Sequence, residues 1–314
     1  MSVREGSAEG SHVKEPGYIP EMHNIKGPHC VPHISTSAPI LHHFNKSSIL
    51  QSTSHASLSD ARTSNAAFNP SYVPTAIITG ATAGIGQSIA EALSRRNRSA
   101  AESIIASLPK LEASQDSASE STYEFVQCDM TIIKNVHNMA KDLNERLSKV
   151  NFLVHCAAIV GLGGRKEADP KEGLDEKMAT LYYARWKLTY DLLPLLRKAK
   201  EEARKPVLCR YLVRGLRRSD GQSNCYNDLM IAEFAAREPD IAFTHIHPGA
   251  VYTGTMVNKG DCAEHMLSAL LSAKKGMNRR NWKGDDIGMK KFPQKEGAQK
   301  ALWDHTLEAT SIDE

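Results

Sequence analysis

The sequence predicts an α/β fold with a doubly wound parallel sheet, and three observations lead to it. A short apolar, β-branched run at Ala76–Ile78 enters a glycine-rich turn, and apolar residues then recur at helical spacing. Further apolar runs of strand character lie at 151–158, 207–212 and 241–246, with helical patterns between them. This alternation is typical of strands that are covered by helices. With 314 residues, 41% of them hydrophobic, the chain is long enough for a substantial core.

Composition excludes several classes of protein. The six cysteines are scattered and form no C-x-x-C pair, which argues against a disulfide scaffold. The longest apolar stretch, 152–164, is interrupted by His155 and is shorter than the ~18 residues of a membrane helix. The first ten residues lack the apolar run of a secretory signal. We therefore expect a cytoplasmic protein that does not act at a membrane.

The uneven distribution of residue types divides the chain into three regions. Residues 1–70 contain seven of the thirteen histidines, are rich in Ser, Thr, Pro and Gly, and have no amphipathic period, so we expect a disordered tail. Residues 71–275 carry the predicted domain, and residues 276–314 form a polar segment of poor periodicity. His29, Cys30 and His33 match no structural zinc spacing, so no metal site is expected.

Two stretches of the chain are strongly basic. Residues 197–218 carry a net charge of +7, and residues 274–295 carry +6. Neither matches a nucleic-acid module or interleaves aromatic residues for stacking on bases. A solvated face or loop is the favoured interpretation, with an acidic partner for 197–218 as the alternative, and no nucleic-acid partner is expected.

The glycine-rich turn spans Thr79–Gly86 and stands between the first strand and the helix that follows it. Glycines let the main chain approach a pyrophosphate without a clash at Cβ, and the start of the helix supplies unpaired amides. The alternative is a tight turn with close helix packing. The strand before and the helix after the turn favour a dinucleotide site.

The sequence pattern of this turn, Thr-Gly-x-x-x-Gly-Ile-Gly, resembles that of the short-chain dehydrogenase/reductase family. Four further motifs follow it in the order in which the family has them. They resemble the family's third strand, its fourth strand, the end of its long fifth helix and its Pro-Gly loop, at 125–129, 151–158, 192–196 and 247–253. The resemblance spans about residues 57–257 and implies a Rossmann-like sheet.

The resemblance also implies an NAD(P)-dependent oxidoreductase that passes hydride between nicotinamide C4 and a carbonyl or alcohol of a small molecule. The residues that it assigns to cofactor binding are Gly80, Thr82, Gly84, Ile85 and Gly86 for the pyrophosphate, Arg96 for a 2′-phosphate, Asp129 for the adenine, Ala157 for the ribose, and Val251 and Thr253 for the carboxamide. Each has a simpler alternative: Asp129 as a helix cap, Ala157 as a residue small enough for close packing, Arg96 as a solvated helix end.

The catalytic residues of the family are not evident. Its general acid is a Tyr whose pKa is lowered by a Lys four residues later. The match in this chain, Tyr183 with Lys187, precedes the strand that should come before the catalytic helix, so we interpret it as coincidence. Tyr226 stands in the helix before the Pro-Gly loop, but residue 230 is Met. Tyr226 is therefore the one remaining candidate for the general acid. The sequence does not support giving it, or any other residue, a catalytic role.

A second gap follows the first helix. Residues 93–99 lead into the next helical pattern without a β-branched run, so the family's second strand has no candidate in this sequence.

Two hypotheses account for the missing catalytic residues and the missing strand. The chain is a divergent member that binds NADP or no cofactor, with sensing or scaffolding in place of hydride transfer. Alternatively, the written sequence lacks two segments, near residues 96 and 215. The choice between NAD and NADP, the substrate and the oligomeric state stay open.

Overall fold

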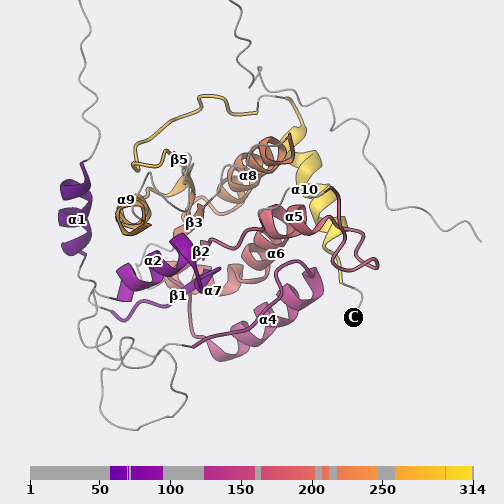
Figure 1. The fold of residues 1–314 in the computed structure, drawn as a ribbon, viewed down its shortest axis with the longest axis horizontal. Helices are drawn as coiled ribbons and strands as arrows, with labels where there is room; N and C mark the ends of the chain where they lie inside the picture. Colours follow the sequence, from indigo (N-terminus) through magenta and orange to yellow (C-terminus); the bar gives the residue numbers. More distant parts are fainter. Residues whose placement is uncertain are drawn as a thin grey trace, which may run out of the picture.

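Five parallel strands form one sheet in the order β1-β2-β3-β4-β5 in a computed structural model of the chain (Figure 1). The structure describes residues 57–68, 70, 72–94, 124–159, 164–201, 207–211, 218–246, 259–293 and 295–312. The strands are β1 (Ala76–Thr79), β2 (Phe152–His155), β3 (Val207–Tyr211), β4 (Ala242–Ile246) and β5 (Gly276–Arg280). The helices are α1 (Leu58–Ala66), α2 (Gly84–Ser94), α4 (Ile133–Arg146), α5 (Glu176–Met178), the π-helical turn η2 (Ala179–Tyr183), α6 (Ala184–Asp191), α7 (Leu193–Glu201), α8 (Arg218–Arg237), α9 (Lys259–Leu271) and α10 (Ala298–Ala309). No helix in these ranges is long and apolar enough to cross a membrane.

The strands are in parallel register, so their carboxyl ends lie along one edge of the sheet, here called the carboxyl edge. Thr79 is opposite His155, and Ile246 is opposite Arg280. In open α/β sheets, ligands bind outside the carboxyl ends of the strands. The fold thus brings the glycine turn, which follows Thr79, to the edge where a ligand is expected.

Helices cover both faces of the sheet, as the doubly wound prediction requires. Side chains alternate along β2: Phe152 and Val154 pack with α2 and α9, whereas Leu153 packs with α4, α6 and α8. Figure 1 shows α1, α9 and α2 on one side and α4, α6, α8 and α10 on the other. The strands β2 and β4 are buried throughout, and their polar residues His155, Thr244 and His245 are buried with the apolar ones.

The connection from β4 to β5 differs in hand from the two before it. The sheet advances in one direction from β2 to β5, yet α6 and α8 lie on one face and α9 lies on the other. A crossover that advances in the same direction over the opposite face has the opposite hand. Such a reversal is rare among parallel crossovers.

The predicted strand at Phe125–Asp129 is wrong for the described structure, which has no strand there. Phe125 is 73% exposed, and β1 pairs only with β2 among the described strands. A strand needs a neighbour to bond its main-chain groups, so an apolar pattern without an adjacent ladder does not form one. Residues 95–123, where the second strand is sought, lie outside the described residues.

The outer two of the three predicted regions also differ from the structure. Residues 58–66, expected in a disordered tail, form α1, which begins at a capping box between Ser57 and Asp60. Asn65 donates from Nδ2 to the main-chain oxygen of Glu264 (2.7 Å) and so ties α1 to α9. Beyond residue 275, β5 pairs with β4 and α10 packs on α8, so this segment completes the sheet and its core. Composition missed α1 because a polar side chain, that of Asn65, ties this helix to α9.

Trp303 anchors α10 to the core. It is 4% exposed, and its ring lies 4.9 Å from Phe234 and 5.1 Å from Trp186, measured between ring centroids. The guanidinium of Arg237 lies over the same ring, 4.2 Å from its centroid. One helix near the chain terminus therefore closes the apolar face of α6 and α8.

We expect Trp303→Ala to lower the free energy of unfolding by about 3–5 kcal/mol, because it removes the ring that fills this junction. Urea unfolding followed by circular dichroism measures the change. Leu307→Ala on the same helix is the matched control, since Leu307 is 38% exposed, and should change the value by less than about 0.5 kcal/mol. Equal effects of the two substitutions would show that α10 is not anchored as described.

Candidate functional site

The glycine turn between β1 and α2 depends on two left-handed residues. Gly80 has φ +70° and Gly84 has φ +63°, a region that residues with a Cβ rarely adopt. The first of these bends the chain out of β1, and the second begins α2. The sequence pattern of this turn therefore corresponds to a real backbone requirement.

A second requirement is close approach of the turn to β2. A Cβ on Gly80 would lie 2.6 Å from the amide nitrogen of Ala157, and one on Gly86 would overlap the carbonyl oxygen of Gly80. The same atom on Gly86 would lie 3.0 Å from Cβ of Cys156. The turn, the first coil of α2 and the end of β2 are thus in direct contact, which accounts for the small residues at all three places.

The other side of the turn is open. A Cβ on Gly84 would meet nothing within 4 Å, and Thr82 is exposed. The first amides of a helix have no partner within the helix, so this end of α2 offers donors and a positive dipole end to an anion. Ile85 differs from its neighbours, because its side chain is buried in the core between α2 and α9. Only its main chain is available to a ligand.

The end of β2 is held by hydrogen bonds from both sides. The amide of Cys156 donates to the carbonyl oxygen of Thr79 (3.1 Å), and Nη2 of Arg185 on α6 donates to the carbonyl oxygen of Ala157 (2.6 Å). Burial raises the pKa of the Cys156 thiol to about 12, so this thiol is protonated at neutral pH and is a poor nucleophile. Nothing in the sequence around Arg185 indicates this contact.

Asp129 is exposed and closes a local turn, accepting from the amide (2.9 Å) and the hydroxyl (2.7 Å) of Thr131. The capping alternative expected Asp129 to accept hydrogen bonds from the first amides of α4, but it does not. Those amides, of Ile133 and Lys134, donate to the carboxylate of Glu172 at 2.8 and 2.9 Å. Contact of Asp129 with an adenine stays a prediction.

Tyr226 lies on α8, with its ring 5.4 Å from that of Tyr182 (centroid to centroid). Burial raises the pKa of its phenol, whereas general acid catalysis in this type of site uses a lowered one. Its environment therefore does not favour an acid role.

Tyr183 and Lys187 are each bonded to another residue. Nζ of Lys187 forms an ion pair with Asp191 (3.2 Å), and the hydroxyl of Tyr183 is hydrogen-bonded to Nε2 of His305 (2.9 Å). Burial raises the pKa of Tyr183 to about 12. These contacts agree with the interpretation of their spacing as coincidence.

Other predicted residues fall outside the described ranges. Arg96, Val251, Thr253 and the Pro248-Gly249 pair are among them, and so are His29, Cys30 and His33.

A buried polar cluster that the sequence did not reveal ties α8 to β4 and β5. Asp228 accepts from Nε and Nη2 of Arg279 (3.0 and 2.8 Å), and its Oδ1 lies 2.6 Å from Nδ1 of His245. Burial alone would raise the pKa of Asp228, but His245 and Arg279 together hold it well below its ordinary value. Arg279, expected on a solvated basic face, is 3% exposed because Asp228 balances its charge inside the protein.

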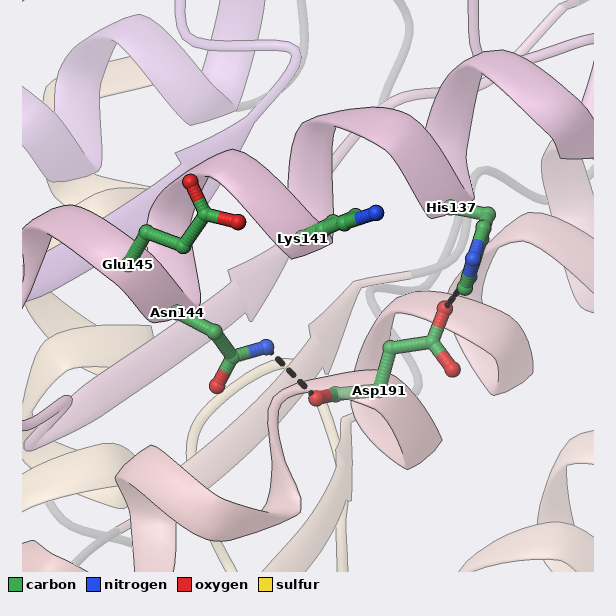
Figure 2. Close-up of a pocket in the computed structure, with 5 residues that line it drawn as sticks. All are labelled: His137, Lys141, Asn144, Glu145 and Asp191. Carbon is green, nitrogen blue, oxygen red and sulfur yellow. Dashed lines mark hydrogen bonds and ion pairs between the residues drawn. The ribbon is translucent and has the colours of Figure 1, made fainter.

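A surface hollow of about 340 Å³ lies between α4 and the end of α6 (Figure 2). Asp191 lines this hollow: its Oδ2 lies 2.8 Å from Nδ1 of His137, and its main-chain oxygen accepts from Asn144 (2.9 Å). Lys141 and Glu145 complete the lining. None of the site residues predicted from the sequence lines this hollow, so it is separate from the glycine turn.

Comparisons with known proteins point in one direction. A family model described as short chain dehydrogenase matches residues 74–203. An oxidoreductase of Emericella nidulans is 28% identical over 225 residues, and an NmrA-like family domain-containing oxidoreductase of an Aspergillus species is 28% identical over 207. These matches cover 64% and 58% of this chain, and 66% and 61% of the relatives, so the chain spans less than two thirds of their length.

Among solved structures, a short-chain dehydrogenase/reductase from Burkholderia xenovorans is similar with a TM-score of 0.50 and 15% identity. The similarity covers 68% of this chain and 98% of that one. At this identity the likeness supports the fold alone, and it agrees with the parallel sheet described above.

We expect Asp228→Asn to lower the free energy of unfolding at pH 7 by about 3–5 kcal/mol, because it leaves Arg279 buried without its counter-charge. The lowered pKa of the folded-state carboxyl stabilises the fold above about pH 4, and this contribution is lost as pH falls toward that pKa. The difference in free energy of unfolding between the parent protein and Asp228→Asn should therefore become smaller below about pH 4. Urea titrations at a series of pH values measure this difference.

The control is Asp240→Asn, which breaks an exposed ion pair with Lys275 and should lower the free energy of unfolding by less than about 1 kcal/mol. A pH-independent difference for Asp228→Asn would contradict the assignment.

Proposed function

We propose that this chain, which is similar to the short chain dehydrogenase family model over residues 74–203 and to curated oxidoreductases, is a short-chain dehydrogenase/reductase: an NAD(P)-dependent oxidoreductase acting on a carbonyl or alcohol group of a small molecule. The observation that carries the proposal is the glycine turn, packed against the end of β2 on one side and open on the other. The proposal includes a cytoplasmic location and no nucleic-acid or membrane partner.

The residues of the turn fit a dinucleotide. Gly80 and Gly86 let the main chain of the turn lie against the end of β2, where a Cβ on either residue would clash. The free amides at the start of α2 suit the pyrophosphate, as the open surface at Gly84 and Thr82 allows. Beyond the turn, the proposal assigns the ribose to Ala157.

Four further residues complete the proposed contacts. Asp129 is assigned to the adenine, Val251 and Thr253 to the carboxamide, and Arg96 to a 2′-phosphate. The last assignment makes NADP the proposed cofactor in preference to NAD, since a guanidinium pairs well with a phosphate group.

Bound at this turn, the cofactor would supply or accept the hydride at nicotinamide C4. The chain's own part is to hold the dinucleotide along the carboxyl edge and to place a substrate against it. The proton that accompanies the hydride is not assigned to Tyr226, whose phenol is held in a buried environment that raises its pKa. A non-catalytic, dinucleotide-responsive binding protein is the alternative, and binding without turnover would support it.

Titration with NADPH followed by cofactor fluorescence tests the site. We expect saturable binding by the unchanged protein and a loss of at least about tenfold in affinity for Gly86→Ala, because the new methyl group displaces the turn from β2. Gly164→Ala is the matched control, since a Cβ there meets nothing within 4 Å and φ is ordinary. Absence of binding by the unchanged protein would refute the proposed function. Equal binding by the two variants would show that the turn is not part of the cofactor site.

NADPH oxidation measured with a panel of aldehydes and ketones tests the role of Tyr226. We expect the rate of Tyr226→Phe to stay within about threefold of the parent, whereas loss of a true general acid lowers rates by about 10²–10⁴. A decrease of that size, with unchanged affinity for NADPH, would instead establish Tyr226 as the acid.

A further inference from the structure

The main chain of Ala157, two residues beyond the end of β2, is held at both of its polar groups. Its amide donates to the hydroxyl oxygen of Thr79 at 3.4 Å, and its carbonyl oxygen accepts from Nη2 of Arg185 at 2.6 Å. Thr79 ends β1, and Arg185 lies on α6. The two hydrogen bonds therefore join this residue to the neighbouring strand on one side and to the helix layer on the other.

The segment held in this way is the one that contacts the glycine turn. A Cβ on Gly80 would lie 2.6 Å from the amide nitrogen of Ala157 and 2.8 Å from its Cα. Atoms already in contact block a shift of Ala157 toward the turn. Movement away from the turn is therefore the displacement that loss of a hydrogen bond would allow, and it would open the surface between Gly80 and the end of β2.

Arg185 reaches the end of β2 from an irregular helix. In the π-helical turn η2, the amide of Ala184 donates to the carbonyl oxygen of Ala179, a bond that takes in one residue more than an α-helical turn does. An extra residue turns every later side chain by about 100° around the helix axis. Arg185 follows this turn directly and points to the strand. Such turns are frequent at functional sites.

Stability alone does not account for an arginine at this position. The side chain is fully buried, and burial lowers the pKa of its guanidinium to about 10, which shows that keeping the charge inside the protein costs free energy. A well-packed apolar side chain would avoid this cost. It would also leave the carbonyl oxygen of Ala157 without the hydrogen bond from α6.

We infer that Arg185 is a positioning residue of the proposed cofactor site: through the carbonyl oxygen of Ala157, it holds the surface assigned to the ribose against the glycine turn. The inference rests on the proposed function. A site built from main chain binds tightly when that chain is fixed before the ligand arrives, because a mobile chain has to be ordered at the expense of affinity. Arg185 needs no contact with the cofactor for this role.

Thr189 on the same helix provides a matched control. It lies one turn after Arg185, and its hydroxyl is hydrogen-bonded to Nε2 of His155 at 3.0 Å, which ties α6 to β2 a second time. Both side chains are buried, but of the two only that of Arg185 bonds the residue that contacts the glycine turn. Thr189→Val removes a hydrogen bond between the same two elements and keeps the shape of the side chain.

Fluorescence titration with NADPH measures the affinity of each folded variant, and hydrogen exchange over residues 152–159 measures how firmly the end of β2 is held. We expect Arg185→Met to lower the affinity about tenfold, the effect of one lost hydrogen bond to a charged group, and to speed exchange. Arg185→Lys keeps a charged donor and should stay within about threefold of the parent. Thr189→Val should stay within about twofold of the parent, even if its free energy of unfolding falls as much.

Three outcomes overturn the inference and leave the proposed function intact: equal affinities for Arg185→Met and Thr189→Val, equal losses for Arg185→Met and Arg185→Lys, or a loss for Arg185→Met without faster exchange. The last would mean that the charge acts on the cofactor directly. If Arg185→Met does not fold, Arg185→Gln takes its place, since its amide ends two atoms short of the Nη2 position. If the unchanged protein does not bind NADPH, the inference and the proposed function fail together.

Discussion

The contact between the glycine turn and the end of β2 is the constraint on which the rest of this structure depends. Gly80 can lie against Ala157 only because neither residue carries a bulky side chain there. The parallel ladder sets the distance from β1 to β2, and this contact sets how closely the start of α2 lies against the carboxyl edge. The same contact links Arg185, through the carbonyl of Ala157, to the surface proposed for the cofactor.

The elements predicted correctly from the sequence were those with a strong local pattern. The strand at 76–79, the turn and the buried strands β2 and β4 each combine apolar runs with glycine or turn residues, and all are present. Phe125–Asp129 shows the limit of this reasoning, because whether an apolar segment becomes a strand depends on a neighbouring strand that its own sequence does not specify.

The candidate site was only partly predictable for the same reason. Gly80, Gly84 and Gly86 impose their geometry locally, so their spacing alone indicates it. Arg185 and the pair of Asp228 with Arg279 gain their roles from partners 28 and 51 residues away. A basic residue in a basic stretch is ordinarily solvated, and nothing near Arg279 in sequence indicates the carboxylate that allows its burial.

The parallel pairing of β1 with β2 has a consequence for how the protein folds. Thr75 donates its amide to the side chain of Asn151, a contact across 76 residues, and the glycine turn meets β2 over a similar separation. Closing a loop of this length has an entropic cost, and contacts between residues far apart in the sequence slow folding. The surface proposed for the cofactor therefore exists only when two segments that are distant in the sequence have paired.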